Sequence, residues 1–299
     1  MLDPKKVLDA LEAKRDQFSD AIALRQQELE ALSKLLQTFQ SMSKAEVDAR
    51  LANIACPGAR PTGEHELYDS LVVPFAHDWE NHRQAREWAL SVLQNVPTVA
   101  VDGSQITPSK DISIPVGVVQ VGWFENRHSA DGTYVKDLNV EVLPPDELVE
   151  DEGQISGFPD WKINWRRFEL EVERIAEYMQ QHAGSESTPV CFFDGSLIVS
   201  FVQHMKPERQ QLYVDAVARL LRTSEETRIP LIGYVDTSYA NDLTAMLTHL
   251  ANTVFMGRVS DAAILRPMMK WGDRSQVYVC ARDDQVLGKY YEQVCFSYL

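Results

Sequence analysis

The spacing of apolar residues predicts helices in the first third of the chain. In residues 4–52, apolar side chains recur every 3, 4 or 7 residues with charges between them: Val7, Leu11, Phe18, Ile22, Leu29, Leu32, Leu36 and Phe39. This pattern is typical of one long helix or a helical hairpin, packed on its own domain or on a partner. Pro and Gly residues interrupt it at 57–63, and a second helix is predicted over 82–95. We therefore expect residues 1–95 to form a helical region that serves assembly.

From residue 97 the pattern alternates between strands and helices. Short apolar or β-branched runs predict strands at 98–101, 115–125, 133–143, 189–193, 230–235, 276–281 and 292–298. Periodic stretches predict helices at 161–182, 207–222 and 239–250. The order of three strands, helix, strand, helix, strand and helix resembles an α/β ribonuclease-H-like mixed sheet flanked by helices, although other mixed sheets share it. We expect residues 96–299 to form this domain, with the helical region as an N-terminal extension.

Composition narrows the class of protein. The chain has 299 residues, of which 44% are hydrophobic, and no apolar run approaches a membrane span, so we expect a soluble cytoplasmic protein. The four cysteines form no CxxC pair, which argues against a zinc site or a disulfide framework. The sequence contains neither GxxxxGK[ST] nor GxGxxG, so a partner would have to supply any ATP hydrolysis.

A formal net charge of −15 argues against a protein that coats nucleic acid with its whole surface. Part of this charge is an acidic run in a predicted loop: Asp146, Glu147, Glu150, Asp151 and Glu152. A later stretch has a local excess of positive charge. Its basic residues, which we consider candidates for binding phosphates in a local channel, are Arg258, Arg266, Lys270 and Arg274.

The candidate chemistry lies in two Asp-Gly-Ser triplets, each predicted to follow a strand. Asp102 and Asp194 lead these triplets, and Ser104 and Ser196 end them. Because ligands of open α/β sheets gather at the carboxyl ends of strands, the two aspartates converge if their strands are neighbours. Their carboxylates would then suit Mg²⁺ or Mn²⁺, and the serines could bind substrate. A single triplet would more often be an Asx-turn that closes a strand.

A phosphodiesterase of this architecture needs a third acid from the first long helix. Glu169 and Glu171 flank that helix's predicted apolar stripe on opposite sides, whereas Glu173 points further out. Either flanking glutamate could complete a site for two metal ions. Exposure to solvent is the commoner role for any one glutamate on a charged helix.

Three segments together resemble the successive motifs of the NurA nucleases: AVDGSQ at 100–105, the Arg-x-x-Leu-Glu pattern of 167–171, and FFDGSL at 192–197. The resemblance covers residue 97 to about 298. It implies a manganese-dependent 5′ to 3′ exonuclease and single-strand endonuclease, acting in DNA end resection and double-strand break repair. It also implies a homodimer that encloses a channel and a hexameric HerA translocase as partner. It assigns Asp102, Glu171 and Asp194 to the catalytic metal site, with Arg167 as a substrate-binding residue.

Two departures from the family pattern affect this assignment. Asp236 stands after a strand where members often have Lys, so it is either a further metal ligand or a turn residue. The chain ends in CFSYL, where the family normally continues to a His near the metals, so we expect the C-terminal part to be incomplete. The main alternative is a noncatalytic scaffold that acts by oligomerisation or partner binding. A hydrolase with Ser104 or Ser196 as nucleophile ranks lower, because no GxSxG elbow is present.

Overall fold

The structure is a computed structural model that describes residues 3–109, 111–148, 160–282 and 294–299. It divides into two compact units. The sheet unit comprises residues 78–236, and the terminal unit comprises residues 1–77 and 237–299. Glu150, Asp151 and Glu152 of the expected acidic run, and residues 292–293 of the last expected strand, lie outside the described residues.

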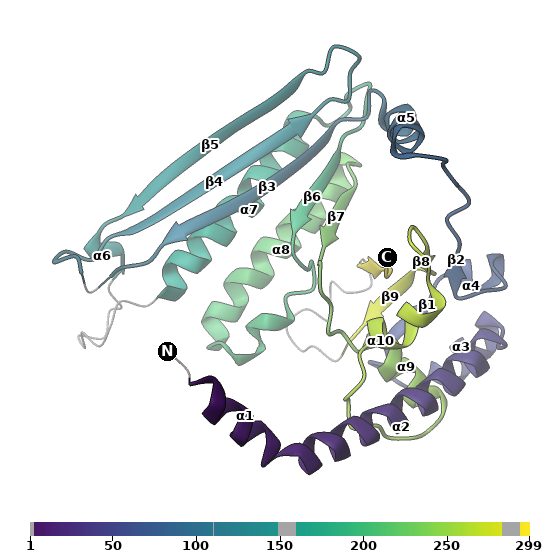
Figure 1. Cartoon of the computed structure of the whole chain (residues 1–299). Helices are drawn as coiled ribbons and strands as arrows, with labels where there is room; N and C mark the ends of the chain where they lie inside the picture. Colours follow the sequence, from purple (N-terminus) through teal and green to yellow (C-terminus); the bar gives the residue numbers. More distant parts are fainter. Residues whose placement is uncertain (1–2, 110, 149–159, 283–293) are drawn as a thin grey trace. The chain divides into compact units, whose positions relative to one another are not determined.

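A five-stranded mixed sheet forms the centre of the sheet unit (Figure 1). Its strands, in the order β5-β4-β3-β6-β7, are Tyr134–Leu143, Gly117–Asn126, Thr98–Ile106, Val190–Asp194 and Leu231–Tyr234. The first three strands pair antiparallel, and β3, β6 and β7 pair parallel. This topology confirms the predicted α/β ribonuclease-H-like fold.

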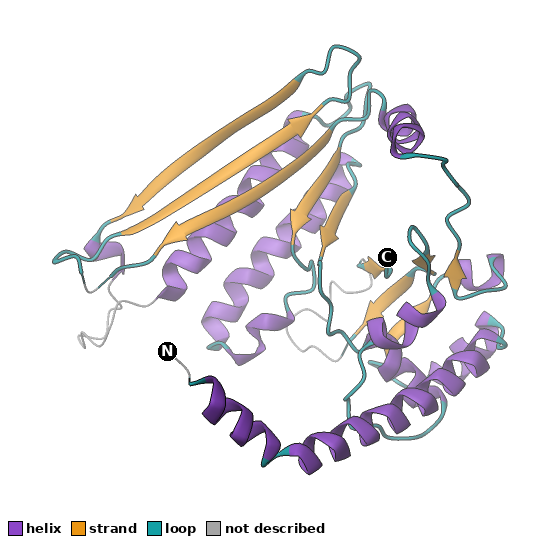
Figure 2. Ribbon diagram, viewed as in Figure 1, coloured by secondary structure: helices purple, strands orange, loops and turns teal. Residues whose placement is uncertain are grey.

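Two long helices cover one face of this sheet (Figure 2). α7 (Asp160–Gln181) packs on β3 and β4, and α8 (Pro207–Thr227) packs on α7. The apolar stripe of α7 supplies the core through Ile163, Phe168, Val172, Ile175 and Met179. Shorter elements of the unit are α5 (His82–Leu93), α6 (Pro145–Leu148) and η1 (Ser200–His204).

The opposite face of the sheet is exposed, and we call it the open face. On β3, Val99 and Val101 are buried toward the helices, while Ala100 and Asp102 are exposed. The same alternation on β6 buries Phe193 and exposes Asp194. Successive side chains of a strand point to opposite faces, so both aspartates lie on the open face.

The N-terminal helices and the C-terminal segment build the terminal unit together. Its helices are α1 (Pro4–Glu12), α2 (Arg15–Gln40), α3 (Lys44–Leu51), α4 (Glu64–Leu67), α9 (Asp242–Leu250), α10 (Asp261–Leu265) and η2 (Arg266–Met268). Its strands are β1 (Gly58–Pro61), β2 (Val72–Val73), β8 (Arg274–Ser275), β9 (Tyr278–Ala281) and β10 (Cys295–Phe296). Only the second half of the N-terminal apolar series is buried, because Leu32, Leu36 and Phe39 share a core with α9. The compact units therefore do not follow the boundary expected near residue 95.

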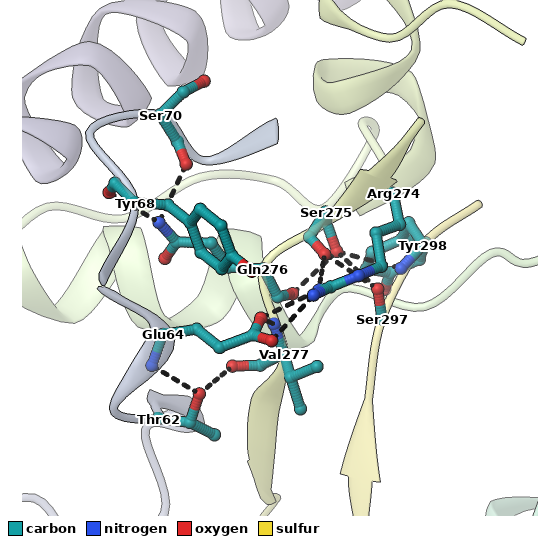
Figure 3. A network of polar contacts seen from close by, with 10 residues as sticks. All are labelled: Thr62, Glu64, Tyr68, Ser70, Arg274, Ser275, Gln276, Val277, Ser297 and Tyr298. Carbon is teal, nitrogen blue, oxygen red and sulfur yellow. Dashed lines mark hydrogen bonds and ion pairs between the residues drawn. The ribbon is translucent and has the colours of Figure 1, made fainter. Parts of the chain in front are cut away.

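A polar network fastens α4 to β8 in the terminal unit (Figure 3). Arg274 donates to both carboxylate oxygens of Glu64, at 2.7 and 2.8 Å. The backbone N–H of Val277 donates to the same carboxylate at 2.9 Å, and the Gln276 amide donates to the Ser70 carbonyl at 2.9 Å. These bonds add to the pairing of β2 with β8, which are strands of only two residues each.

Within the described residues, no helix is both long enough and apolar enough to cross a membrane.

Candidate active site

Asp102 and Asp194 occupy equivalent positions on neighbouring strands. β3 and β6 pair parallel up to Val101 and Phe193, and each aspartate is the next residue of its strand. Both are exposed on the open face. Adjacent strands lie about 4.8 Å apart, so the two carboxylates are set side by side at the same level of the sheet.

The position of Asp102 along its strand differs from the expectation. We predicted that the strand ends at Val101, but β3 continues through the Asp-Gly-Ser triplet to Ile106. The reason is β4, which pairs with β3 along its whole length, from Thr98 opposite Asn126 to Ile106 opposite Val118. Asp102 is therefore a mid-strand residue beside the end of β6, and Asp194 alone stands at a strand end.

Glu171 reaches the same region from the helical side of the sheet. Its carboxylate lies where a side chain at Gly103 would be, so the glycine next to Asp102 makes room for it. Arg167, one turn earlier on α7, donates to Glu171 at 2.7 Å and approaches the Gly103 carbonyl at 3.4 Å. The Gly103 N–H also favours the charged form of the Glu171 carboxyl. The helix acid is thereby fixed against the backbone that follows Asp102.

The environment of Glu171 disfavours its charged form. The pKa of Glu171 is raised to about 7, chiefly by burial; Arg167 and the Gly103 N–H lower it in part, and the nearby Asp102 contributes to raising it. A carboxyl held in this way near neutral pH is a common feature of functional sites. A cation placed beside Glu171 would favour its ionised form.

The structure separates Glu171 from the other glutamates of its helix. Glu169 pairs with Arg166 at 2.7 Å, and Arg166 also holds Glu141 of β5 through two bonds of 2.8 Å. Glu173 lies 3.6 Å from Arg166. Glu169, the alternative helix acid, thus belongs to an ion-pair network on β5, whereas Glu171 adjoins Asp102.

The turn that follows Asp194 has a defined shape. Gly195 has a φ of 139°, a value that L side chains rarely adopt, and its N–H donates to the Tyr234 carbonyl at 3.0 Å. The Ser196 hydroxyl accepts from the Ile198 N–H at 3.0 Å, so this serine closes the turn. Ser104 is exposed on the open face, two residues beyond Asp102. Asp236 is exposed two residues after the end of β7.

The four basic candidates all lie in the terminal unit. Arg258, Arg266 and Lys270 are exposed. Arg274 is committed to Glu64 through its two bonds, which gives it a structural role. Phosphate binding by the other three stays a prediction.

Asp102 and Asp194 form a pair on the open face, and Glu171 lies nearby on the helical side. In the parts of the chain that the structure describes, no three acidic, histidine or cysteine side chains gather closely enough to form a ready-made metal site. The donor set at this end of the sheet consists of carboxylates, which suits hard divalent cations. The arrangement places the exposed carboxylates of Asp102 and Asp194 on the open face, and the buried carboxyl of Glu171 lies against Gly103 on the helical side of β3.

Two residues at the same level of the sheet were not singled out by the sequence. Gly122 pairs with Asp102 across β3 and β4, and Tyr234 pairs with Asp194 across β6 and β7. Strand alternation could have assigned each to a face of its strand. Cross-strand register is needed to place them beside the aspartates, and local sequence does not specify it.

Comparison with known proteins identifies one matching family model. The family model described as NurA domain matches residues 96–297. No curated protein matches the chain. A solved structure of LC9-RNase H1, a type 1 RNase H with the type 2 active-site motif, is 11% identical and covers 59% of this chain and 82% of its own, with a TM-score of 0.26. A crystal structure of NurA is also 11% identical, and the match covers 74% of this chain and 59% of that one, with a TM-score of 0.26.

Proposed function

Because the chain belongs to the NurA family, we propose that it is a divalent-metal-dependent deoxyribonuclease whose site is built on Asp102, Asp194 and Glu171. The observation that carries this proposal is the placement of Asp102 and Asp194. They stand at equivalent positions of neighbouring parallel strands, exposed on one face, with Glu171 against the next residue of β3. A stability role does not account for two exposed carboxylates side by side, because like charges at this spacing repel each other.

The residues suit Mn²⁺ or Mg²⁺, and two ions per site is the arrangement we propose. Asp102, Asp194 and Glu171 would hold them, and Asp236 is a further candidate ligand. When bound, such ions activate a water molecule and stabilise the leaving oxygen of a phosphodiester. The raised pKa of Glu171 fits this role, since the charged form needs a compensating cation.

The protein's own groups would position this chemistry. Arg167 donates to the Glu171 carboxylate, which lies against Gly103, so this acid is held beside the backbone that follows Asp102. The Gly195 turn directs the chain away immediately after Asp194, so substrate can approach its carboxylate. Ser104 lies on the same open face, where its hydroxyl can donate to a phosphate oxygen.

Membership of the NurA family suggests a more specific activity and a set of partners. We infer 5′ to 3′ exonuclease and single-strand endonuclease activity in DNA end resection and double-strand break repair. The partners we infer are DNA ends, a second copy of the chain and a hexameric HerA-type ATPase. Arg258, Arg266 and Lys270 are the cations that we expect to meet phosphates, and cytoplasmic localisation follows from the proposed substrate.

A cleavage assay tests the proposal. Labelled single-stranded and duplex DNA should be degraded by the wild type in Mn²⁺ or Mg²⁺ and left intact in EDTA. Asp102→Asn and Asp194→Asn should each abolish cleavage while leaving the circular dichroism spectrum unchanged, because each removes a ligand charge from an exposed position. Glu169→Gln is the matched control on α7 and should cleave normally. Full activity in both aspartate variants would refute the site, and an inactive wild type would favour the noncatalytic alternative.

A further inference from the structure

Five residues form one line across the open face of the sheet. Register places Leu138 of β5 opposite Gly122 of β4, Gly122 opposite Asp102, and Asp194 opposite Tyr234 of β7. Asp102 and Asp194 are each one residue beyond the last β3–β6 pair, so they continue the same line. Residues paired in this way point to the same face. The carboxylate pair therefore has bare backbone on one side and an aromatic ring on the other.

Gly122 differs from the other glycines of this sheet. A Cβ at Gly117 or Gly233 would meet another atom at 2.8 Å, and a Cβ at Gly103 would meet the Glu171 carboxylate. Close contacts with α7 at Gly103 and Gly117, and with the turn after β6 at Gly233, therefore require those three glycines. A Cβ at Gly122 would meet only backbone oxygens at 3.8 and 4.0 Å, which is ordinary contact. Its φ lies outside the left-handed range.

Neither conformation nor packing thus explains a glycine in the middle of β4. Glycine weakens a strand interior, and its occurrence there often marks a place where a ligand approaches the backbone closely. Gly122 lies directly opposite Asp102, so a ligand that approaches its backbone also approaches the carboxylate pair.

Tyr234 has the opposite character. It ends β7, and its side chain is 52% exposed on the open face beside Asp194. An exposed aromatic ring next to a phosphodiester-cleaving site offers a flat surface on which a base can stack. Bases are available for stacking on protein rings only where the nucleic acid is unpaired.

Resting on the proposed function, we propose that Gly122 and Tyr234 are substrate-positioning residues for single-stranded DNA. The bare backbone at Gly122 admits the sugar and phosphate next to the scissile bond, and the Tyr234 ring stacks on the base on the other side of the carboxylates. A single strand then crosses the sheet along the line of Gly122, Asp102, Asp194 and Tyr234.

Fluorescence anisotropy with a fluorescein-labelled oligothymidylate in EDTA tests this without cleavage. Tyr234→Ala should weaken binding by about tenfold to a hundredfold, and Tyr234→Phe should bind like the wild type, since the ring carries the effect. Gly122→Val should weaken binding more than Gly122→Ala. Gly122→Ala should keep the wild-type melting temperature, because a Cβ there makes only ordinary contacts, and the melting temperature of Gly122→Val is measured beside its binding to show that it folds.

Tyr134→Ala is the matched control for Tyr234→Ala. Tyr134 is 53% exposed on the same face, but its ring is stacked on Phe124, and its partner Asn126 is four residues from Gly122, or about 13 Å along β4. It should bind like the wild type.

The outcomes separate this inference from the proposed function. Normal binding by both Tyr234→Ala and Gly122→Val overturns the inference, and so does a wild type that binds no single strand. Asp102→Asn, which tests the function, should lose cleavage and keep binding in EDTA. If the wild type binds but fails to cleave in Mn²⁺, the proposed function fails, and the binding of the Tyr234 and Gly122 variants still decides the inference.

Discussion

Replacing Glu171 by Gln should stabilise the metal-free sheet unit at alkaline pH while destroying activity. The folded protein raises the pKa of Glu171 from 4.5 to about 7, chiefly through burial. Glutamine has nearly the same shape and no charge, and its amide oxygen can still accept from Arg167, which now donates to Glu171 at 2.7 Å. The substitution therefore removes the cost of a buried charge with little change in packing.

The sign and size of the effect follow from linkage. Below pH 4.5 the carboxyl is protonated in both folded and unfolded chains, and it costs nothing. Between 4.5 and about 7 the unfolded chain ionises first, so the free energy of unfolding falls as pH rises. Each pH unit is worth about 1.4 kcal/mol, which gives a full loss of about 3 kcal/mol above pH 7. Glu171→Gln should match the wild type at acid pH and exceed it by up to about 3 kcal/mol at alkaline pH.

Urea denaturation in EDTA, followed by tryptophan fluorescence, measures this difference. The sheet unit holds five of the six tryptophans, so the signal reports mainly on it: Trp79, Trp88, Trp123, Trp161 and Trp165. Curves at about pH 5 and about pH 8 give the pH dependence for each protein. Glu177→Gln, at an exposed position of the same helix, is the control and should follow the wild type at both pH values. If Glu171→Gln also runs parallel to the wild type, Glu171 is not held as a partly protonated acid.

Three further changes test other parts of the structure. Gly103→Ala should destabilise the sheet unit by about 1–3 kcal/mol in urea denaturation, because the new methyl group takes the space of the Glu171 carboxylate; wild-type stability would contradict that packing. Asp261→Asn should lower the stability of the terminal unit by about 1–3 kcal/mol, because its buried carboxylate accepts two backbone N–H groups of α9 at 2.8 Å and one amide oxygen cannot replace both; an unchanged denaturation midpoint would contradict it. Neutralising both Arg258 and Arg266 should weaken DNA binding for all sequences and flatten its salt dependence, with no change in melting temperature; an identical salt slope would place the DNA elsewhere.

The sequence was sufficient for the order of elements in the sheet unit. Alternation and apolar runs located all five strands and both long helices, because each element is regular enough to repeat its pattern several times. The same patterns missed β1, β2 and β8, which have two to four residues and owe their pairing to segments far away in the chain. The common core of α2 and α9 was missed for the same reason, since periodicity does not identify a helix's partner.

The sequence identifies some residues of the candidate site, and tertiary contacts are needed for the others. Two identical triplets were enough to select Asp102 and Asp194, and equivalent positions on parallel strands follow once their strands are neighbours. Helical geometry placed Glu169 and Glu171 on either side of the same stripe and could not choose between them. The choice depends on tertiary contacts: Gly103 leaves space for Glu171, while Arg166 and Glu141 draw Glu169 toward β5.

The most direct test of the central claim measures Mn²⁺ binding and DNA cleavage on the same samples of wild type and Asp194→Asn. Asp194 lies on a different strand from Asp102, so the claim that they form one site requires both properties to depend on it. The account predicts that Asp194→Asn loses Mn²⁺ affinity and cleavage together while its melting temperature in EDTA is at least that of the wild type, because one of two repelling charges is gone. A variant that still binds Mn²⁺ and cuts DNA like the wild type would contradict it.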